Sequence, residues 1–371
     1  MPLLRRLYAA ASRVRRAVAP RRTDALTEAA LTAALIGPQR LVAVDAGAAN
    51  GLLPHWQHLP HVATVYQIEP RQDACRELEA INAAAGYPGR CKIVATGLSR
   101  TGGERTLYVS NAPTGSSLFE IDPARSADCA AYVDLRYLYP IVPTPIQTES
   151  LGEVLSRYGE DKLDLVKLDI QGAELEVMQG LDAQRLDSLL AVEIEVGLHD
   201  LYPKEAGFHA AQAFFEAQGL ELFDVRVARV HLPRAGNHEH FQTQVFGTYG
   251  NSPSVSARIW EFDAVYFRKR SLLLARRDAQ ALRRMMAIYC TYNYFAEAYD
   301  LVEQGHAQGV LDAPLAAELK QAVVDLHFVK HHRPWLADTP LMRFLRRKAY
   351  AIAPRSAPRW CQYMYQNYPN G

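Results

Sequence analysis

The stretch VKLDIQGAELEVMQG, residues 166–180, constrains the fold of this chain more than any other segment. Alternating apolar residues lead to Asp169, a turn containing Gly172 follows, and a helical pattern begins near Glu174. A buried strand that ends in a carboxylate and turns through a glycine into a helix is typical of a βαβ unit. The stretch therefore predicts a parallel sheet with polar side chains at its edge.

Strands and helices alternate along most of the chain. We predict strands at 40–47, 64–70, 91–99, 189–196, 220–226 and 260–269, and helices at 24–36, 71–86, 148–159 and 209–219. Residues 102–120 contain Gly-Gly and Asn-Ala-Pro-Thr-Gly turns typical of a hairpin, whereas residues 122–147 show no regular pattern. Because alternating strands and helices form right-handed βαβ units, the predicted fold class is α/β with a mostly parallel sheet.

A chain of 371 residues is too long for one small domain. We predict a basic N-terminal helical region over 1–36, an α/β domain over 37–270 and a helical C-terminal extension over 271–371. Within the extension, aromatic and aliphatic side chains of residues 289–310 recur at helical spacing, which favours a helix-pair core.

Three of the predicted strands end in a carboxylate. Asp45 ends the first strand, Glu69 the second and Asp169 the fourth, while Gly47 and Gly51 follow the first strand. Ligands of such sheets bind at the carboxyl ends of the strands. Glycines let a backbone approach a ligand closely. We therefore expect these residues to surround one ligand.

The residues at these strand ends favour a ligand with a ribose and positive charge. The carboxylate of Glu69 can accept two hydrogen bonds from a ribose diol. The glycine spacing at 47–51 is Gly-x-x-x-Gly, not the Gly-x-Gly-x-x-Gly of a dinucleotide site, which disfavours NAD. Carboxylates at Asp45 and Asp169 suit an ammonium and a sulfonium. The sequence thus predicts S-adenosylmethionine as the cofactor.

The segments VAVDAGAANG, VYQIEP, GLS and DLVKLDIQGAELEVMQG together resemble the FkbM-type methyltransferases over roughly residues 40–270. That family implies a Rossmann-like, seven-stranded sheet of the S-adenosylmethionine-dependent class. It also implies methyl transfer to a hydroxyl, often on a sugar or a polyketide. The resemblance implies cofactor-binding roles for Asp45, Gly47, Gly51, Glu69 and Asp169, and Gly172 and Glu174 match the same strand-four motif as Asp169. Asn50 is a further candidate, although it stands one position later than the Asn of the family.

Further candidates for the site come from a turn and from the later strand ends. Ser116 and Ser117 lie in the turn TGSSLFE and are candidates for contact with the cofactor. A sugar hydroxyl is a weak nucleophile, so a nearby base would help as its proton leaves. The candidate catalytic residues are Asp169, Glu174, Glu193 and His199. Histidine has the most suitable unperturbed pKa for this task, whereas Asp169 has the best-supported position.

Several other kinds of site are disfavoured. His238 and His240 have no further ligand motif beside them, so no metal is predicted. The five cysteines are scattered and form no CxxC, which favours a reducing compartment. The residues after Asp169 lack the Asn/Asp-Pro-Pro-aromatic run of base-amine methyltransferases, so no nucleic-acid partner is expected.

Charge is distributed unevenly along the chain. Residues 1–23 hold seven Arg and no acid, and residues 330–371 hold eight Lys or Arg and one acid, so each end carries +7 and the rest carries −13. Such ends are either solvated surface helices or segments attracted to an anionic membrane surface. No apolar run is long enough to span a membrane. We therefore expect a cytoplasmic protein, in peripheral contact with the inner membrane face under the second interpretation.

Two functions fit these features. The first is an S-adenosylmethionine-dependent O-methyltransferase that acts on a hydroxyl of a glycan, a glycolipid precursor or a similar small metabolite. The second is a catalytically silent Rossmann-like module that binds a partner through its helical extension. Turnover of the cofactor would separate the two.

Overall fold

A computed structural model describes residues 22–111, 115–122, 138–198, 202, 206–231 and 258–331. Its strands are β1 (Leu41–Ala46), β2 (Ala63–Ile68), β3 (Cys91–Val94), β4 (Gly97–Leu98), β5 (Gly103–Val109), β6 (Val142–Glu149), β7 (Leu165–Leu168), β8 (Ala191–Gly197), β9 (Leu220–His231) and β10 (Arg258–Arg268). The basic ends, residues 1–21 and 332–371, lie outside this described part of the chain.

The helices fall between the strands and after the last of them. They are α2 (Arg22–Ile36), α3 (Gln72–Ala85), α5 (Leu151–Arg157), α6 (Glu174–Gln179), α7 (Ala183–Ser188), α8 (Phe208–Ala217), α9 (Arg270–Ala275), α10 (Ala279–Thr291), α11 (Phe295–Ala307) and α12 (Ala313–His331), with the short 3-10 helices η1 (Pro54–Trp56) and η2 (Leu59–His61). The helices predicted at 24–36, 71–86, 148–159 and 209–219 are present in this set.

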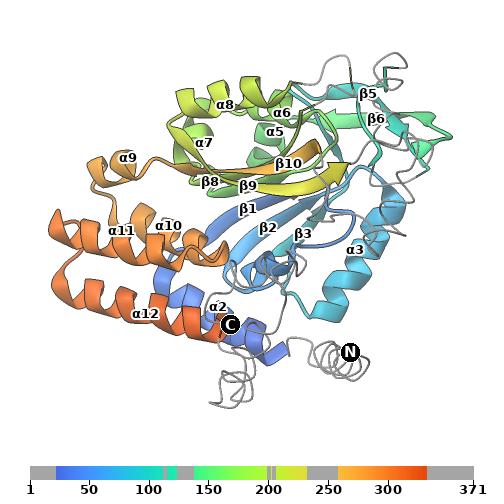
Figure 1. Ribbon diagram of the computed structural model, residues 1–371. Helices are drawn as coiled ribbons and strands as arrows, with labels where there is room; N and C mark the ends of the chain where they lie inside the picture. Colours follow the sequence, from blue (N-terminus) through green and yellow to red (C-terminus); the bar gives the residue numbers. More distant parts are fainter. Residues whose placement is uncertain are drawn as a thin grey trace, which may run out of the picture.

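The main sheet has seven strands in the order β3-β2-β1-β7-β8-β10-β9. The first five strands of that order run parallel, and β10 runs antiparallel to both β8 and β9. The predicted fold class is therefore confirmed: a Rossmann-like α/β sheet of seven strands followed by C-terminal helices (Figure 1). A second, smaller sheet has the order β4-β6-β5.

Alternate residues of each strand pack into different layers, because successive side chains point to opposite faces of a sheet. Val42 and Val44 of β1 belong to a core with helices α5, α6 and α8. Leu41 and Ala43 belong to a second core with helices α2, α10, α11 and α12 (Figure 1). The C-terminal helices therefore cover one face of the sheet and share its hydrophobic core.

A buried ion pair also joins the C-terminal helices to the sheet. Arg284 of α10 places its Nε 2.9 Å from Oδ1 of Asp164, the residue before β7, and both side chains are buried. The other carboxylate oxygen of Asp164 accepts a hydrogen bond from the backbone N–H of Val42 at 2.9 Å. One carboxylate thus links α10, β7 and β1.

Three details of the sequence prediction were wrong. Residues 91–99 do not form one strand, because β3 and β4 belong to different sheets. Residues 102–120 do not form a simple hairpin, because β5 pairs antiparallel with β6, in a segment predicted to be irregular. Pro143 and Pro145 hid β6, and they are tolerated there because β4 pairs only with its last two residues.

The start of helix α5 also differs from the prediction. The helix begins at Leu151 and not at Thr148, because Thr148 belongs to β6. The N-cap is Ser150, whose Oγ accepts a hydrogen bond from the N–H of Glu153, while the Glu153 carboxylate accepts from the N–H of Ser150. This reciprocal capping box was visible in the sequence as Ser-x-x-Glu.

The buried pair leads to a prediction about stability. We expect Arg284→Met to lower the free energy of unfolding by about 3–5 kcal/mol, because Asp164 would remain buried without its counter-charge. Arg276→Met is the matched control, since Arg276 pairs with exposed Asp187 and should cost about 1 kcal/mol or less. Urea denaturation of both variants measures the difference. Equal small losses would show that the C-terminal helices do not depend on this pair.

Candidate active site

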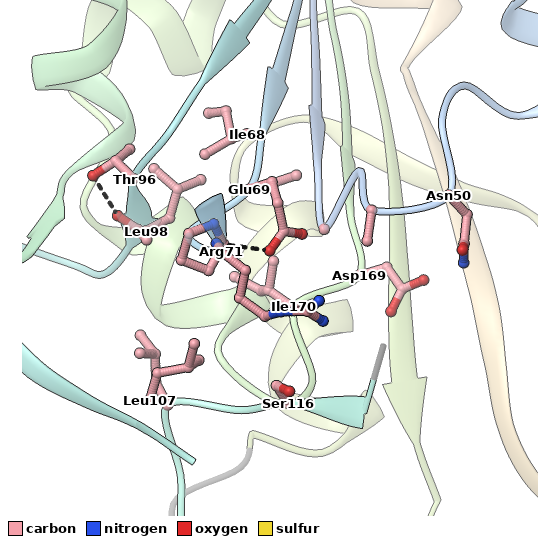
Figure 2. Close-up of a pocket in the computed structure, with 16 residues that line it drawn as sticks. Asn50, Ile68, Glu69, Arg71, Thr96, Leu98, Leu107, Ser116, Asp169 and Ile170 are labelled. Atoms are coloured by element: carbon pink, nitrogen blue, oxygen red, sulfur yellow. Dashed lines mark hydrogen bonds between the residues drawn. The ribbon is translucent and has the colours of Figure 1, made fainter. Parts of the chain in front are cut away.

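A cleft opens at the carboxyl ends of β1, β2 and β7, where the sequence places its acids and glycines (Figure 2). The wall of the cleft is formed by segments that follow these strands and by the turn after β5. Among the lining residues are Gly47, Asn50, Glu69, Arg71, Thr96, Ser116 and Asp169. Five of the residues predicted to bind a cofactor therefore line the same cleft: Gly47, Asn50, Glu69, Ser116 and Asp169.

Gly47 sits at the closest contact between two of these segments. Its φ is +78°, in the left-handed region that favours glycine. A Cβ on Gly47 would lie 1.8 Å from the carbonyl oxygen of Asp169. No larger residue can occupy this position unless the backbone moves. The glycine thus lets the loop after β1 lie directly against the loop after β7.

Glu69 directly follows β2 and is 5% exposed. Its Oε1 accepts a hydrogen bond from the backbone N–H of Arg71 at 2.9 Å. No hydrogen bond within the described residues engages Oε2, which leaves that oxygen for a ligand in the cleft. Burial raises the pKa of Glu69, while the N–H and the guanidinium of Arg71 lower it, and the net shift is upward.

A row of polar side chains crosses the sheet beside the cleft. Gln67, Asp45, Lys167 and Glu193 are register partners on β2, β1, β7 and β8. All four are buried. The Nζ of Lys167 lies 3.7 Å from Oδ1 of Asp45 and 3.3 Å from Oδ2 of Asp169. Lys167 therefore bridges an acid in the row and an acid in the cleft wall.

Glu193 is held by residues from three other elements. Its Oε2 accepts a hydrogen bond of 2.6 Å from the hydroxyl of Tyr292, directly after α10. His55 Nε2 and an Arg226 nitrogen each lie 3.7 Å from its carboxylate. Burial raises the pKa of Glu193, but His55, Arg226 and Tyr292 lower it below its usual value. A residue of the C-terminal helices thus reaches the face of the sheet that carries the site.

Glu174, at the start of α6, supports the turn that follows Asp169. Its carboxylate accepts hydrogen bonds from the backbone N–H groups of Ile170 at 2.8 Å and Gly172 at 2.9 Å. Gln171, between them, has a φ of +61°. The amide nitrogen of Gln171 donates to Asp169 at 3.1 Å and to Glu195 at 2.7 Å. Glu174 therefore shapes the loop that presents Asp169.

Three more of the predicted residues, Asp45, Gly51 and Ser117, do not line the cleft. Asp45 lies in the buried row. The Oγ of Ser117 donates to the carbonyl of Gln171 at 2.6 Å, so it joins two loops. Gly51 has a φ of +77° and closes the turn after β1. His199 falls outside the described residues. The individual roles predicted for all of these residues stay predictions.

The sequence analysis missed Asp263, in the middle of β10. Asp263 is the register partner of both Glu195 on β8 and Arg226 on β9. Burial raises its pKa to about 7, with further upward contributions from Glu193 and Asp169. Its carboxylate makes no hydrogen bond or ion pair with another residue that the structure describes. The available signal was an acid amid the apolar residues of WEFDAVYF.

Comparison with known proteins identifies a family for this region. Residues 45–222 match the family model of the methyltransferase FkbM domain. The chain is 27% identical over 175 residues to the methyltransferase sdnD of Sordaria araneosa. That alignment covers 43% of this chain and 67% of sdnD. An uncharacterized protein of Listeria monocytogenes serotype 4b aligns over 80% of this chain and 97% of that chain with a TM-score of 0.29 and 7% identity, and this likeness carries no argument.

FkbM methyltransferases use S-adenosylmethionine, and the cleft fits that cofactor. Glu69 offers a carboxylate oxygen to a ribose diol, and Gly47 leaves room for a ligand at the strand ends. Asp169 and Asn50 line the end of the cleft nearest β7 and β1.

The position of Glu69 leads to a prediction about cofactor affinity. We expect Glu69→Ala to weaken the binding of S-adenosylmethionine and S-adenosylhomocysteine about 10- to 100-fold, because a charge-assisted hydrogen-bond pair is lost. Asp73→Asn is the matched control, since Asp73 is an exposed acid one turn away that pairs with Arg71. Titration calorimetry measures both variants. Wild-type affinity in Glu69→Ala would remove Glu69 from the site.

Proposed function

We propose that this chain, whose residues 45–222 match the methyltransferase FkbM domain, is an S-adenosylmethionine-dependent methyltransferase that acts on a hydroxyl oxygen of a glycan, a glycolipid precursor or a similar small metabolite. The observation that carries this proposal is the polar character of the surface next to the cofactor cleft. Beyond Asp169, that surface includes the partly buried side chains of Gln171, Glu195, Asp263 and Arg226. A hydroxyl-rich acceptor can exchange hydrogen bonds with their carboxylate, amide and guanidinium groups.

The polar surface follows the carboxyl end of the sheet away from Asp169. Gln171 connects Asp169 to Glu195, Asp263 stands opposite Glu195, and Arg226 stands opposite Asp263. An apolar acceptor would displace water from these groups and offer no hydrogen bonds in exchange, which is costly. A saccharide can offer several hydroxyl donors to the carboxylates and acceptor oxygens to Arg226 and Gln171.

Methyl transfer from a sulfonium needs little activation of the donor. The site mainly has to hold the acceptor oxygen in line with the sulfur–methyl bond, and the polar surface supplies contacts for that placement. As the new carbon–oxygen bond forms, the hydroxyl proton must leave. A base of suitable pKa within hydrogen-bond distance contributes typically about 10²–10⁴-fold to such a step.

Asp263 is the carboxylate we propose as this base, in addition to the candidates named from the sequence. Glu193 is enclosed by Tyr292, His55 and Arg226, and Glu174 holds backbone N–H groups, which favours supporting roles for both. Asp169 is shared between Lys167 and Gln171. Asp263 has no such engagement within the described residues, so its oxygens are free to accept a proton.

Other features of the chain have a more limited bearing on function. The part of the chain that the structure describes contains no helix long and apolar enough to cross a membrane. The basic ends fall outside that part, so contact with an anionic membrane surface stays an expectation from the sequence. The second function, a catalytically silent module that binds a partner through its helical extension, is separated from the first by the absence of turnover.

A direct assay separates these functions. We expect the purified protein to transfer label from S-adenosylmethionine carrying a ¹³C methyl group to at least one member of a panel of mono- and oligosaccharides, giving a methyl ether in the NMR spectrum. The Glu69→Ala variant should transfer less at the same cofactor concentration. Cofactor binding without transfer to any hydroxyl compound would favour the silent module, and transfer to amines alone would contradict O-methylation.

The proposed base predicts a pH dependence. With the saccharide that accepts the label, kcat should rise with pH through about 7, because Asp263 must lose its proton before it can accept another. Asp263→Asn should lower kcat about 10²–10⁴-fold and abolish that rise. Asp161→Asn, an exposed acid at the opposite end of the sheet, should retain the wild-type profile. An unchanged profile in Asp263→Asn would exclude it as the base.

A further inference from the structure

The buried polar row is an unusual use of the sheet core. Gln67, Asp45, Lys167 and Glu193 occupy one line across four adjacent parallel strands. They are 0%, 2%, 8% and 2% exposed. Toward the amino ends of the same strands, the same face carries Val65, Ala43, Leu165 and Ala191. Charged groups in such a place are costly to bury and are retained where their charge has a use.

Asp45 is the least compensated member of the row. Neither carboxylate oxygen has a hydrogen-bond partner among the described residues, and the same is true of the neighbouring Gln67 Nε2. The nearest cation is Lys167, whose Nζ is 3.7 Å from Oδ1. Buried polar groups are almost always hydrogen-bonded, so each exception calls for an explanation. A positively charged ligand in the adjoining cleft would supply the charge that Asp45 lacks.

Lys167 joins the buried row to the wall of the cleft. Its Nζ is 3.3 Å from Oδ2 of Asp169, and Asp169 lines the cleft. With both acids ionised, Asp45, Lys167 and Asp169 together carry one negative charge. S-adenosylmethionine carries an ammonium, a sulfonium and a carboxylate, and therefore one positive charge. S-adenosylhomocysteine has a neutral thioether and no net charge.

We propose that the buried carboxylate of Asp45, linked to Asp169 by the ammonium of Lys167, gives the cleft the single negative charge that matches S-adenosylmethionine and not its demethylated product. The match is lost when the sulfonium becomes a thioether, which favours release of the product. This inference rests on use of the cofactor and is independent of which acceptor is methylated. Its chemistry is a difference in binding, with no bond made or broken by Lys167.

The proton on Asp45 controls this charge. Burial raises the pKa of Asp45 to about 6, Lys167 lowers it, and Asp169 and Glu193 raise it. The other group facing Asp45 is the thiol of Cys91, beside uncharged Gln67. Above pH 6, Asp45 is ionised and the three-residue group favours the cationic cofactor. Below pH 6, Asp45 is protonated, the group is neutral and the preference falls.

The test is the ratio of the two affinities measured by titration calorimetry between pH 5 and 7, where the α-amino group of either ligand stays protonated. Asp263 also titrates near this range, so the series is run in the Asp263→Asn background. The preference for S-adenosylmethionine over S-adenosylhomocysteine should increase about tenfold from pH 5 to 7. This is the effect of one unit charge at roughly 10 Å with an effective dielectric constant of about 20.

In two variants the ratio of the two affinities should not change with pH, but its value should differ between them. Asp45→Asn leaves a neutral pair of Lys167 and Asp169, so the ratio should stay at the low value of the parent at pH 5. Lys167→Met should raise the pKa of Asp45 above the measured range of pH 5 to 7, so that Asp45 stays protonated. Asp169 then carries the one negative charge of the group, and the affinity ratio should stay at the high value that the parent has at pH 7. Lys162→Met, an exposed lysine before β7, is the matched control and should keep the parent profile.

A second measurement needs no substitution that could impair folding. In protein labelled with ¹³C at the aspartate carboxyl carbons, the Asp45 resonance should titrate near pH 6 without ligand. S-adenosylmethionine should lower that pKa further than S-adenosylhomocysteine does. Equal shifts with the two ligands, or an affinity ratio that does not change with pH in the parent protein, would overturn the proposal.

Discussion

The contact between the backbone of Gly47 and the carbonyl group of Asp169 determines how the rest of the site is arranged. β1 and β7 are neighbours in the sheet, so the loops that leave their carboxyl ends must pass each other at short range. Position 47 requires a glycine because the carbonyl group of Asp169 lies too close to leave space for a Cβ atom. This contact places Asp169 beside the glycine turn that follows β1, and both segments line the cleft next to it.

The C-terminal helices stabilise the same region from below the sheet. They share a hydrophobic core with the amino-terminal halves of the strands, and Arg284 and Asp164 join them at the base of β7. At the other end of the strands, Tyr292 donates a hydrogen bond to Glu193 within the polar row. The helices are thus a structural part of the methyltransferase sheet, and they contact the layer of side chains that lies beside the cofactor cleft.

The sequence was sufficient for the features that depend on neighbours along the chain. Apolar strands ending in Asp45, Glu69 and Asp169 predicted the parallel sheet and its cleft, because parallel strands bring their carboxyl ends together. The prediction of β6 was wrong because Pro143 and Pro145 are tolerated only where a strand edge is open. Asp263 and Tyr292 could not be assigned, since their positions depend on the antiparallel direction of β10 and on how α10 packs against the sheet.

We infer that S-adenosylmethionine binds in the cleft lined by Asn50, Glu69 and Asp169, with its methyl group toward the polar surface of β8 and β10. A crystal structure with bound S-adenosylhomocysteine tests this most directly. The account predicts ribose hydroxyls hydrogen-bonded to Glu69 and the sulfur atom on the Asp169 side of the cleft, facing Glu195 and Asp263. A ribose away from Glu69, or a sulfur atom enclosed on the side opposite Asp263, would contradict it.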